Sequence, residues 1–255
     1  GRAGAAGLAR VLRERNLGPS RFVVLEELGA AAERIVESTA DAWGETQVHT
    51  LHTIAVECRP ALGALVLPRT PGLPDAAYES DGQLTKRAVR AVTLAALGPG
   101  PAQLLWDVGA GSGSIAIEWL RAERTARAVA IEARADRAAR IAANALRLGV
   151  PALEVREGTA PGALDGLERP DAVFVGGGLS AAGLLDRCWD ALVPAGRIVA
   201  NAVTLAGEQA LHAARAAHGG ELLRLAVSHA EPLGDLEAWR PQLPVVQWSA
   251  GKDSA

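Results

Sequence analysis

From residue 82 onward, short apolar runs alternate with stretches in which apolar residues recur at helical spacing. A helix over 85–97 comes first, and Gly98-Pro99 ends it. Such alternation predicts a parallel sheet with helices on both faces. The expected strands are 103–107, 127–131, 152–156, 171–175 and 196–201, and the expected helices are 114–122, 135–148, 180–192 and 204–217.

Two late strands, over 222–229 and 243–249, follow each other without a full helix between them. Strands joined without a crossover helix pair antiparallel. We therefore expect an α/β fold whose seven-stranded sheet is mostly parallel and ends in an antiparallel edge strand.

The first 60 residues follow a different pattern. They predict a helix over 3–15 and strands over 21–26, 33–37 and 48–58, without a glycine-rich loop. Residues 61–81 contain three prolines, which fix φ and remove a backbone donor, so this stretch is predicted to be a linker. We divide the chain into a small α+β domain (1–60), this linker (61–81) and a larger α/β domain (82–255).

The strand over 103–107 leads into a glycine-dense turn and then directly into a helix. Glycines let a ligand approach the backbone, and the helix N–H groups point at it. A dinucleotide fingerprint would have its third glycine where this chain has Ser114. The candidate cofactor residues of the turn are Asp107, Gly109, Ala110, Gly111, Ser112 and Gly113. The pattern resembles the S-adenosylmethionine loop of Rossmann-like class I methyltransferases; a structural turn and an NAD site are the alternatives.

Other positions at the carboxyl ends of predicted strands fit the same ligand. Asp107 is expected to order the glycine turn or to meet the cofactor's amino group, and helix capping is the alternative. Glu132 can accept hydrogen bonds from both ribose hydroxyls, or else be a solvated acid at a strand end. Small residues around Thr159 and Ala160 leave room for adenine, although Thr159 followed by Pro161 also suits a helix start.

The loop after the strand over 171–175 contains Gly176, Gly177 and Gly178. Enzymes that methylate amide or adenine nitrogens usually have an Asn-Pro-Pro-aromatic motif here, so three glycines argue against that chemistry. A wall of glycines suits the close approach of a broad, flat substrate, with a flexible turn as the alternative.

Composition narrows the function classes further. The net charge is −3 and basic residues are scattered, which argues against a nucleic-acid partner. No apolar run approaches the roughly 20 residues that span a bilayer, and Cys58 and Cys188 match no metal or redox spacing. We expect a cytoplasmic protein without a membrane partner or a metal. The chain lacks methionine, so it is expected to be processed or, as the first 60 residues favour, a fragment of a longer protein.

An ordered set of motifs resembles one family closely. The motifs are 82–90, 107–113, 157–161, 175–178 and Asn201, and together they are similar to the decarboxylating precorrin-6 methyltransferases of vitamin B12 synthesis over roughly residues 75–250. The resemblance implies methylation of carbon 15 of the macrocycle and loss of CO2 from the ring C acetate. It implies S-adenosyl-L-methionine as cofactor, held by Thr85, residues 109–113, Glu132 and Ala160. Glu132 and Thr159 stand where this family commonly has Asp, and each keeps a hydrogen-bonding group.

The implied substrate is a tetrapyrrole with several carboxylates, which arginine and lysine side chains would bind. The basic candidates are Lys86, Arg87, Arg187 and Arg240, and the other candidate substrate residues are Gly176, Gly177, Gly178 and Asn201. No single residue is indicated for the decarboxylation.

Residues 1–60 are similar to the tail of the tetrapyrrole methylase that serves carbon 5, in the segments 22–29, 33–36 and 52–57. In some organisms the two enzymes are fused, so the chain resembles the C-terminal part of the fused protein, and we expect no carbon 5 methylation by this chain alone. The resemblance also implies a homo-oligomer such as a tetramer. A class I methyltransferase acting on tRNA and a non-catalytic scaffold are the alternatives.

Overall fold

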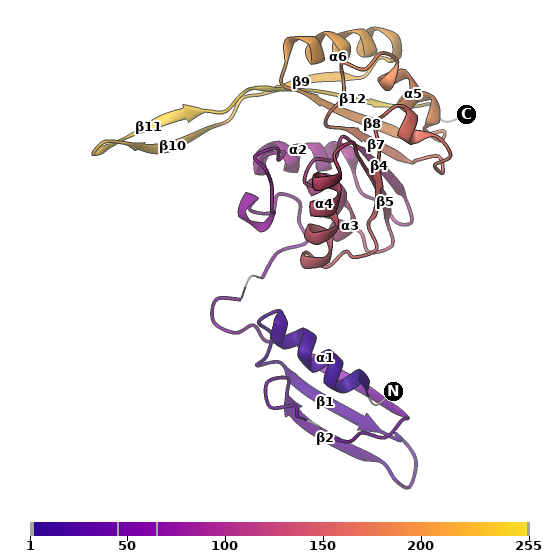
Figure 1. Ribbon diagram of the computed structural model, residues 1–255, viewed down its shortest axis with the longest axis vertical. Helices are drawn as coiled ribbons and strands as arrows, with labels where there is room; N and C mark the ends of the chain where they lie inside the picture. Colours follow the sequence, from indigo (N-terminus) through magenta and orange to yellow (C-terminus); the bar gives the residue numbers. More distant parts are fainter. Residues whose placement is uncertain (1–2, 45, 65, 254–255) are drawn as a thin grey trace. The chain divides into compact units, whose positions relative to one another are not determined.

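The computed structural model describes residues 3–44, 46–64 and 66–253. The chain forms two compact units, Gly1–Leu67 and Pro68–Ala255, and each is described by itself (Figure 1).

The first unit is one helix on a three-stranded antiparallel sheet. Helix α1 (Ala3–Glu14) packs on β1 (Arg21–Glu26), which lies between β2 (Arg34–Thr39) and β3 (His52–Glu57). The helix buries one face because its small and apolar residues recur at helical spacing. Its core consists of Ala5, Ala9, Leu12, Phe22, Val24, Ala40, Trp43 and Val48. The third strand is shorter than expected from the sequence.

The second unit contains a seven-stranded sheet in the order β6-β5-β4-β7-β8-β12-β9. The parallel strands are β4 (Leu104–Val108), β5 (Arg127–Glu132), β6 (Glu154–Glu157), β7 (Ala172–Val175) and β8 (Arg197–Ala202). The last strand, β12 (Val245–Gly251), inserts antiparallel between β8 and the edge strand β9 (Glu221–Leu225). The expected sheet is therefore confirmed, and the strand with reversed direction lies one position in from the edge.

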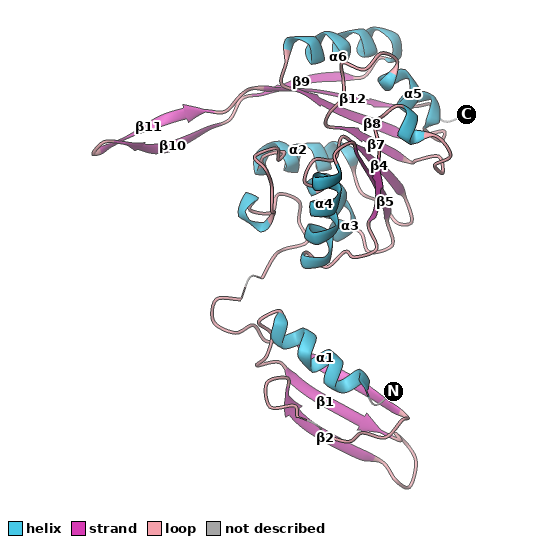
Figure 2. Ribbon diagram, in the orientation of Figure 1, coloured by secondary structure: helices cyan, strands magenta, loops and turns pink. Residues whose placement is uncertain are grey.

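Helices cover both faces of this sheet (Figure 2). One face carries α2 (Arg87–Leu97), α3 (Ser114–Ala122) and α4 (Ala135–Arg147), and the other carries α5 (Leu184–Ala191) and α6 (Leu205–His218). Two short 3₁₀ helices lie at Asp75–Ala77 and Gly162–Leu164. Helix α5 starts later than expected because Gly183, at φ +73°, forms its N-cap.

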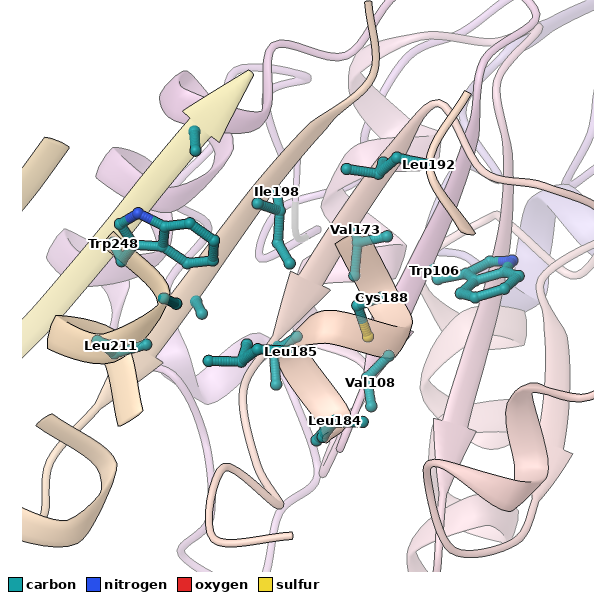
Figure 3. Close-up of a cluster of buried hydrophobic side chains, with 14 of the residues drawn as sticks. Trp106, Val108, Val173, Leu184, Leu185, Cys188, Leu192, Ile198, Leu211 and Trp248 are labelled. Carbon is teal, nitrogen blue, oxygen red and sulfur yellow. The ribbon is translucent and has the colours of Figure 1, made fainter. Parts of the chain in front are cut away.

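Alternating strand residues form a hydrophobic core on the face covered by α5 and α6 (Figure 3). Side chains along a strand alternate between faces, so Trp106 and Val108 point into this core while Asp107 points to the other face. Cys188 lies inside the cluster, where burial raises the pKa of its thiol to about 12. This cysteine is therefore a packing residue of the core.

The C-terminal region differs from the expected structure by a β-hairpin between the last two strands of the sheet. The strand expected over 222–229 is confirmed as far as Leu225 and wrong beyond it: the chain then leaves the sheet and forms β10 (Ser228–Leu233), which pairs with β11 (Leu236–Pro241). The hairpin projects away from the seven-stranded sheet (Figure 1). Nearly all of its side chains are exposed, so no buried face imposes a hydrophobic period on the sequence.

The stretch expected to be a linker over 61–81 is divided between the units. Residues 68–81 belong to the second unit, where Leu73 and Tyr78 are buried. They are fixed by the buried Glu118 carboxylate, which accepts hydrogen bonds from the Gly72 and Leu73 amides and from the Tyr78 hydroxyl. Proline-rich composition here marks an ordered arm, because one buried acid of α3 satisfies its backbone donors.

Candidate functional site

A cavity of about 650 Å³ opens at the carboxyl ends of strands β4 to β8. This is the edge at which open α/β sheets bind their ligands. Twelve of its lining residues were predicted from the sequence: Thr85, Lys86, Gly109, Ala110, Gly111, Glu132, Thr159, Ala160, Gly176, Gly177, Gly178 and Asn201. The two predicted groups, for cofactor and for substrate, therefore meet in one space.

The glycine turn is shaped by positive φ angles. Gly109, Gly111 and Gly113 have φ values of +71°, +60° and +76°, a region that other residues enter only with strain. A Cβ atom at position 109 would lie 2.8 Å from backbone atoms of Gly177. The loops after β4 and β7 thus approach each other closely, and glycine is required where they meet.

Glu132 ends β5 and is 5% exposed. Its Oε2 accepts a hydrogen bond from the Gly111 amide at 2.8 Å, and its Oε1 accepts one from the Arg134 amide at 3.1 Å. A carboxylate oxygen can accept two hydrogen bonds, so each oxygen keeps a lone pair for a ligand in the cavity. The backbone of two loops thus orients this acid toward paired donors such as vicinal hydroxyls.

Asp107 does not line the cavity. Its side chain is fully buried under the glycine turn, where Oδ2 accepts a hydrogen bond from the Ala116 amide in the first turn of α3 at 3.0 Å. Among the described residues, Oδ1 has no hydrogen-bond partner. Burial, with a smaller contribution from the negative charge of Glu132, raises the pKa of Asp107 to about 7. Ser112 is buried in the same turn and, like Gly113, does not line the cavity.

Residues 82–86 form one rim of the cavity beside the glycine turn, where a Cβ atom at position 111 would lie 3.4 Å from the Gln83 carbonyl oxygen. Arg137 of α4 pairs with Asp81 at 2.8 Å between Nε and Oδ2, and this guanidinium holds the pKa of the Asp81 carboxyl below its usual range. The pair ties the rim to α4, beside the cavity. Gln83, Leu84 and Arg137 line the cavity and were not predicted, because their positions depend on this long-range ion pair.

The far half of the cavity is mostly apolar, with Gln242 as a polar member. Its wall comes from residues that flank the hairpin and end β8 and β9: Val203, Leu225, Val227, Leu243 and Val245. Sequence reasoning missed them, because they meet only after β12 inserts between β8 and β9. Of the predicted basic residues, Arg87 does not line the cavity, Arg187 pairs with Asp165 and Arg240 pairs with Glu231 on the hairpin.

Comparison with known proteins assigns this architecture to a family. The family model described as a precorrin methyltransferase domain matches residues 76–252. The chain belongs to the precorrin methyltransferase family. The precorrin methyltransferase domain thus comprises most of the second unit, including every strand of the large sheet.

Individual relatives agree with this assignment. The chain is 48% identical over 247 residues to a precorrin-6Y C(5,15)-methyltransferase (decarboxylating) of Sinorhizobium sp., covering 97% of this chain and 60% of the relative. It is 34% identical over 169 residues to the cobalt-precorrin-6B C(15)-methyltransferase (decarboxylating) of Salmonella typhimurium, covering 64% of this chain and 85% of that protein. The crystal structure of the C-terminal domain of precorrin-6Y C5,15-methyltransferase from Rhodobacter capsulatus superposes with a TM-score of 0.69 at 48% identity, covering 73% of this chain and all of that one. The chain spans about 60% of the length of the Sinorhizobium relative.

Proposed function

We propose that the chain transfers a methyl group from S-adenosyl-L-methionine to carbon 15 of a precorrin macrocycle and removes the carboxylate of the ring C acetate, a step of cobalamin biosynthesis. The observation that carries the proposal is one continuous cavity with a glycine turn and Glu132 at one end and an apolar, glycine-walled half at the other. The names of the Sinorhizobium and Salmonella relatives support the same reaction.

The cavity residues fit the nucleotide. The glycine turn gives the backbone close access to a ligand, and the buried Glu132 carboxylate has free lone pairs for two ribose hydroxyls. Thr159 and Ala160 offer small side chains for the adenine. A volume of about 650 Å³ lies within the range of small-molecule sites and leaves room for part of a second ligand.

When bound, the sulfonium supplies an activated methyl group. The protein's work is then to align the acceptor carbon with that methyl at about 3–3.5 Å and to exclude water. The glycine wall at 176–178 lets a flat macrocycle lie close to the turn, and the apolar half removes one face of the macrocycle from water. For the decarboxylation, the bond between the acetate CH2 and the carboxyl carbon breaks, CO2 leaves, the electron pair passes into the conjugated ring, and a proton from solvent then adds to the CH2 carbon to give a methyl group.

The reaction is tested directly by incubation with precorrin-6B and S-adenosyl-L-methionine, followed by mass spectrometry. We expect a product that has gained one methyl group and lost one CO2. An unchanged precorrin, under conditions in which the chain binds S-adenosylhomocysteine, would refute the proposed function. Methylation of tRNA in a parallel incubation would favour the alternative substrate class.

The role of Glu132 predicts a loss of cofactor affinity. Glu132→Ala removes the acceptor of two charge-assisted hydrogen bonds, so binding of S-adenosylhomocysteine should weaken by at least about 1–2 kcal/mol, or roughly tenfold. Isothermal titration calorimetry measures this. Glu154→Ala is the matched control, because Glu154 is an exposed acid that begins β6 at the end remote from the cavity. Unchanged affinity of Glu132→Ala would reject the ribose assignment.

We propose that the first unit is the end of a tetrapyrrole methylase domain that precedes the precorrin methyltransferase domain in the fused enzymes. The alignment with the Sinorhizobium relative supports this, because it covers 97% of this chain and so includes most of the first unit. The glycine turn, Glu132 and the cavity lie in the second unit. Carbon 15 chemistry is accordingly assigned to the second unit.

We also propose that the protein is a homo-oligomer joined through the hairpin β10–β11. Its two strands have free edges, and Leu233, Leu236 and Trp239 are 60%, 74% and 75% exposed. A lone two-stranded ribbon is marginally stable in water, and apolar side chains on it mark a contact surface. A second copy of the chain presents the same free edges, so ribbon can pair with ribbon.

The oligomer proposal predicts a change of molecular mass. Leu236→Glu places a charge in the contact and should lower the mass measured by sedimentation equilibrium toward that of one chain. Leu205→Glu is the control, since Leu205 is 78% exposed but lies at the start of α6. If wild type and Leu236→Glu have the same mass, the hairpin is not the contact.

A further inference from the structure

Three polar side chains from three elements meet behind the cavity wall. Thr93 of α2 is fully buried, Gln247 of β12 is 3% exposed, and Asn201 of β8 lines the cavity. The Asn201 Nδ2 donates to Thr93 Oγ1 at 2.9 Å, and Gln247 Nε2 donates to Thr93 Oγ1 at 3.0 Å and to Asn201 Oδ1 at 2.9 Å. Buried polar groups destabilise a fold unless they are hydrogen-bonded, and these three side chains satisfy one another, which fixes their orientations.

The hydrogen bonds of the cluster have one consistent direction. The Thr93 hydroxyl donates its proton to the Val89 carbonyl at 2.8 Å. Thr93 Oγ1 can therefore only accept from the two amides, so each amide must turn its NH2 group toward it. The Gln247 NH2 then uses its second proton on Asn201 Oδ1. Thr93 and Gln247 thus fix which atom of the Asn201 amide is nitrogen and which is oxygen.

Within the part of the chain that the structure describes, one donor of this cluster has no partner and is left for a ligand. The Asn201 Nδ2 carries two protons and gives one to Thr93, while both protons of the Gln247 amide are used inside the cluster. Asn201 is the member that lines the cavity, next to the apolar half. The free Nδ2–H is therefore a pre-oriented donor at the substrate end of the cavity.

A lysine side chain lines the same cavity as Asn201. Lys86 lines the cavity directly before α2, and Val89 lines it one turn further along the helix. Lys86 is the N-cap residue of α2, and Thr93, which binds the Asn201 amide, lies in the second turn of the same helix, so Lys86 and Asn201 line one cavity from α2 and from the strand that α2 supports. Among the described residues, no carboxylate forms an ion pair with Lys86. An ammonium and an amide N–H offered together are complementary to a carboxylate.

We infer that Asn201 binds a peripheral carboxylate of the macrocycle, with Thr93 and Gln247 as positioning residues that orient its amide. The inference rests on the proposed function. In it, the bond from Asn201 to one substrate carboxylate sets how the flat macrocycle is rotated over the glycine wall. The carboxylate is held at Asn201 and Lys86 while the ring face lies against the apolar side chains. Cofactor binding, at Glu132 and the glycine turn, does not involve this cluster.

The test compares Thr93→Val with Thr93→Ser. Valine has the shape of threonine without the acceptor, so the Asn201 amide loses its orientation; serine keeps the hydroxyl. We expect Thr93→Val to raise the KM for the precorrin about tenfold, with kcat and the Kd of S-adenosylhomocysteine unchanged, and Thr93→Ser to remain within about threefold of wild type. A structural role alone would lower the Tm of Thr93→Val and leave its KM unchanged.

A second variant keeps the inference testable if Thr93→Val folds poorly. Asn201→Asp is isosteric and retains the acceptor for Gln247, but it replaces the free donor by an anion. Its KM should rise by more than tenfold while S-adenosylhomocysteine still binds as in wild type. Wild-type KM values in both variants would overturn the inference. A wild-type protein that binds S-adenosylhomocysteine but does not convert the precorrin would instead refute the proposed function.

Discussion

Replacing Arg90 with methionine is expected to lower the free energy of unfolding of the second unit by about 3–5 kcal/mol, because it leaves a buried carboxylate without its cation. The Arg90 side chain is 0% exposed and its Nε lies 2.5 Å from Oε1 of Glu118, which is 2% exposed. Its guanidinium also donates to the Leu73 and Thr85 carbonyls and to Asp75. Methionine fills a similar volume but satisfies none of these acceptors.

Urea unfolding followed by tryptophan fluorescence measures this loss, since every tryptophan except Trp43 belongs to the second unit. Arg127→Met is the control: Arg127 pairs with Glu168 at 2.7 Å, but both side chains are more than half exposed, so less than about 1 kcal/mol should be lost. The double variant Arg90→Met/Glu118→Gln also removes the unpaired carboxylate. Its loss in free energy of unfolding should therefore be smaller than the sum of the losses in the two single variants. Additive effects would mean that the pair is not the source of the stability.

The same ion pair has a consequence for the site. Arg90 binds the Thr85 carbonyl, and Thr85 and its neighbours form one rim of the cavity. Glu118 fixes the arm that leads to this rim. A single buried pair between α2 and α3 therefore holds a proline-rich segment in the position where it closes the cofactor end of the cavity.

The sequence predicts the parts of this molecule that depend on local pattern. Buried parallel strands appear as apolar runs, and a glycine at position 109 is recognisable because the turn needs a positive φ there. Glu132 is also predictable from local pattern, since an acid ends the strand after the glycine turn at the spacing expected of a ribose-binding residue. These features are encoded within single strand–loop–helix units.

The parts that could not be predicted depend on contacts between distant segments. Gln247 reaches Asn201 only because β12 inserts beside β8. The hydrophobic periodicity of the last strands does not predict the order in which they pair. The hairpin has no buried face, so its strands lack an alternating signature. Asp107 illustrates the limit most clearly: its place before the glycines suggested three roles, and only the fold shows its carboxylate under the turn, where it accepts from an amide in the first turn of α3.

This location of Asp107 makes the stability of the second unit depend on pH. The pKa of its carboxyl is about 7 in the folded chain, against a usual value of 3.8, because burial disfavours the charged form. Between these values the folded state binds more protons than the unfolded state. The stability that this group contributes is therefore complete below pH 3.8 and is lost as pH rises through about 7, by at most about 4 kcal/mol.

Asp107→Asn should remove this loss, since asparagine is neutral and its Oδ1 can still accept from the Ala116 amide. We expect the variant to gain stability over wild type as pH rises from 4 to 8, as measured by urea unfolding at each pH. The difference between the two curves isolates Asp107, because all other acids are shared, and Asp165→Asn controls for the loss of one exposed charge. Parallel curves for wild type and Asp107→Asn would show that the carboxyl does not titrate in this range.

The same variant decides what Asp107 does for the cofactor. Its side chain lies outside the cavity lining, so Asp107→Asn should bind S-adenosylhomocysteine within about threefold of wild type. A loss of tenfold or more would instead place the carboxylate against the cofactor's amino group. Glu132→Gln offers an independent reading, because removing that nearby negative charge should lower the pKa of Asp107 and shift the pH dependence of stability to lower pH.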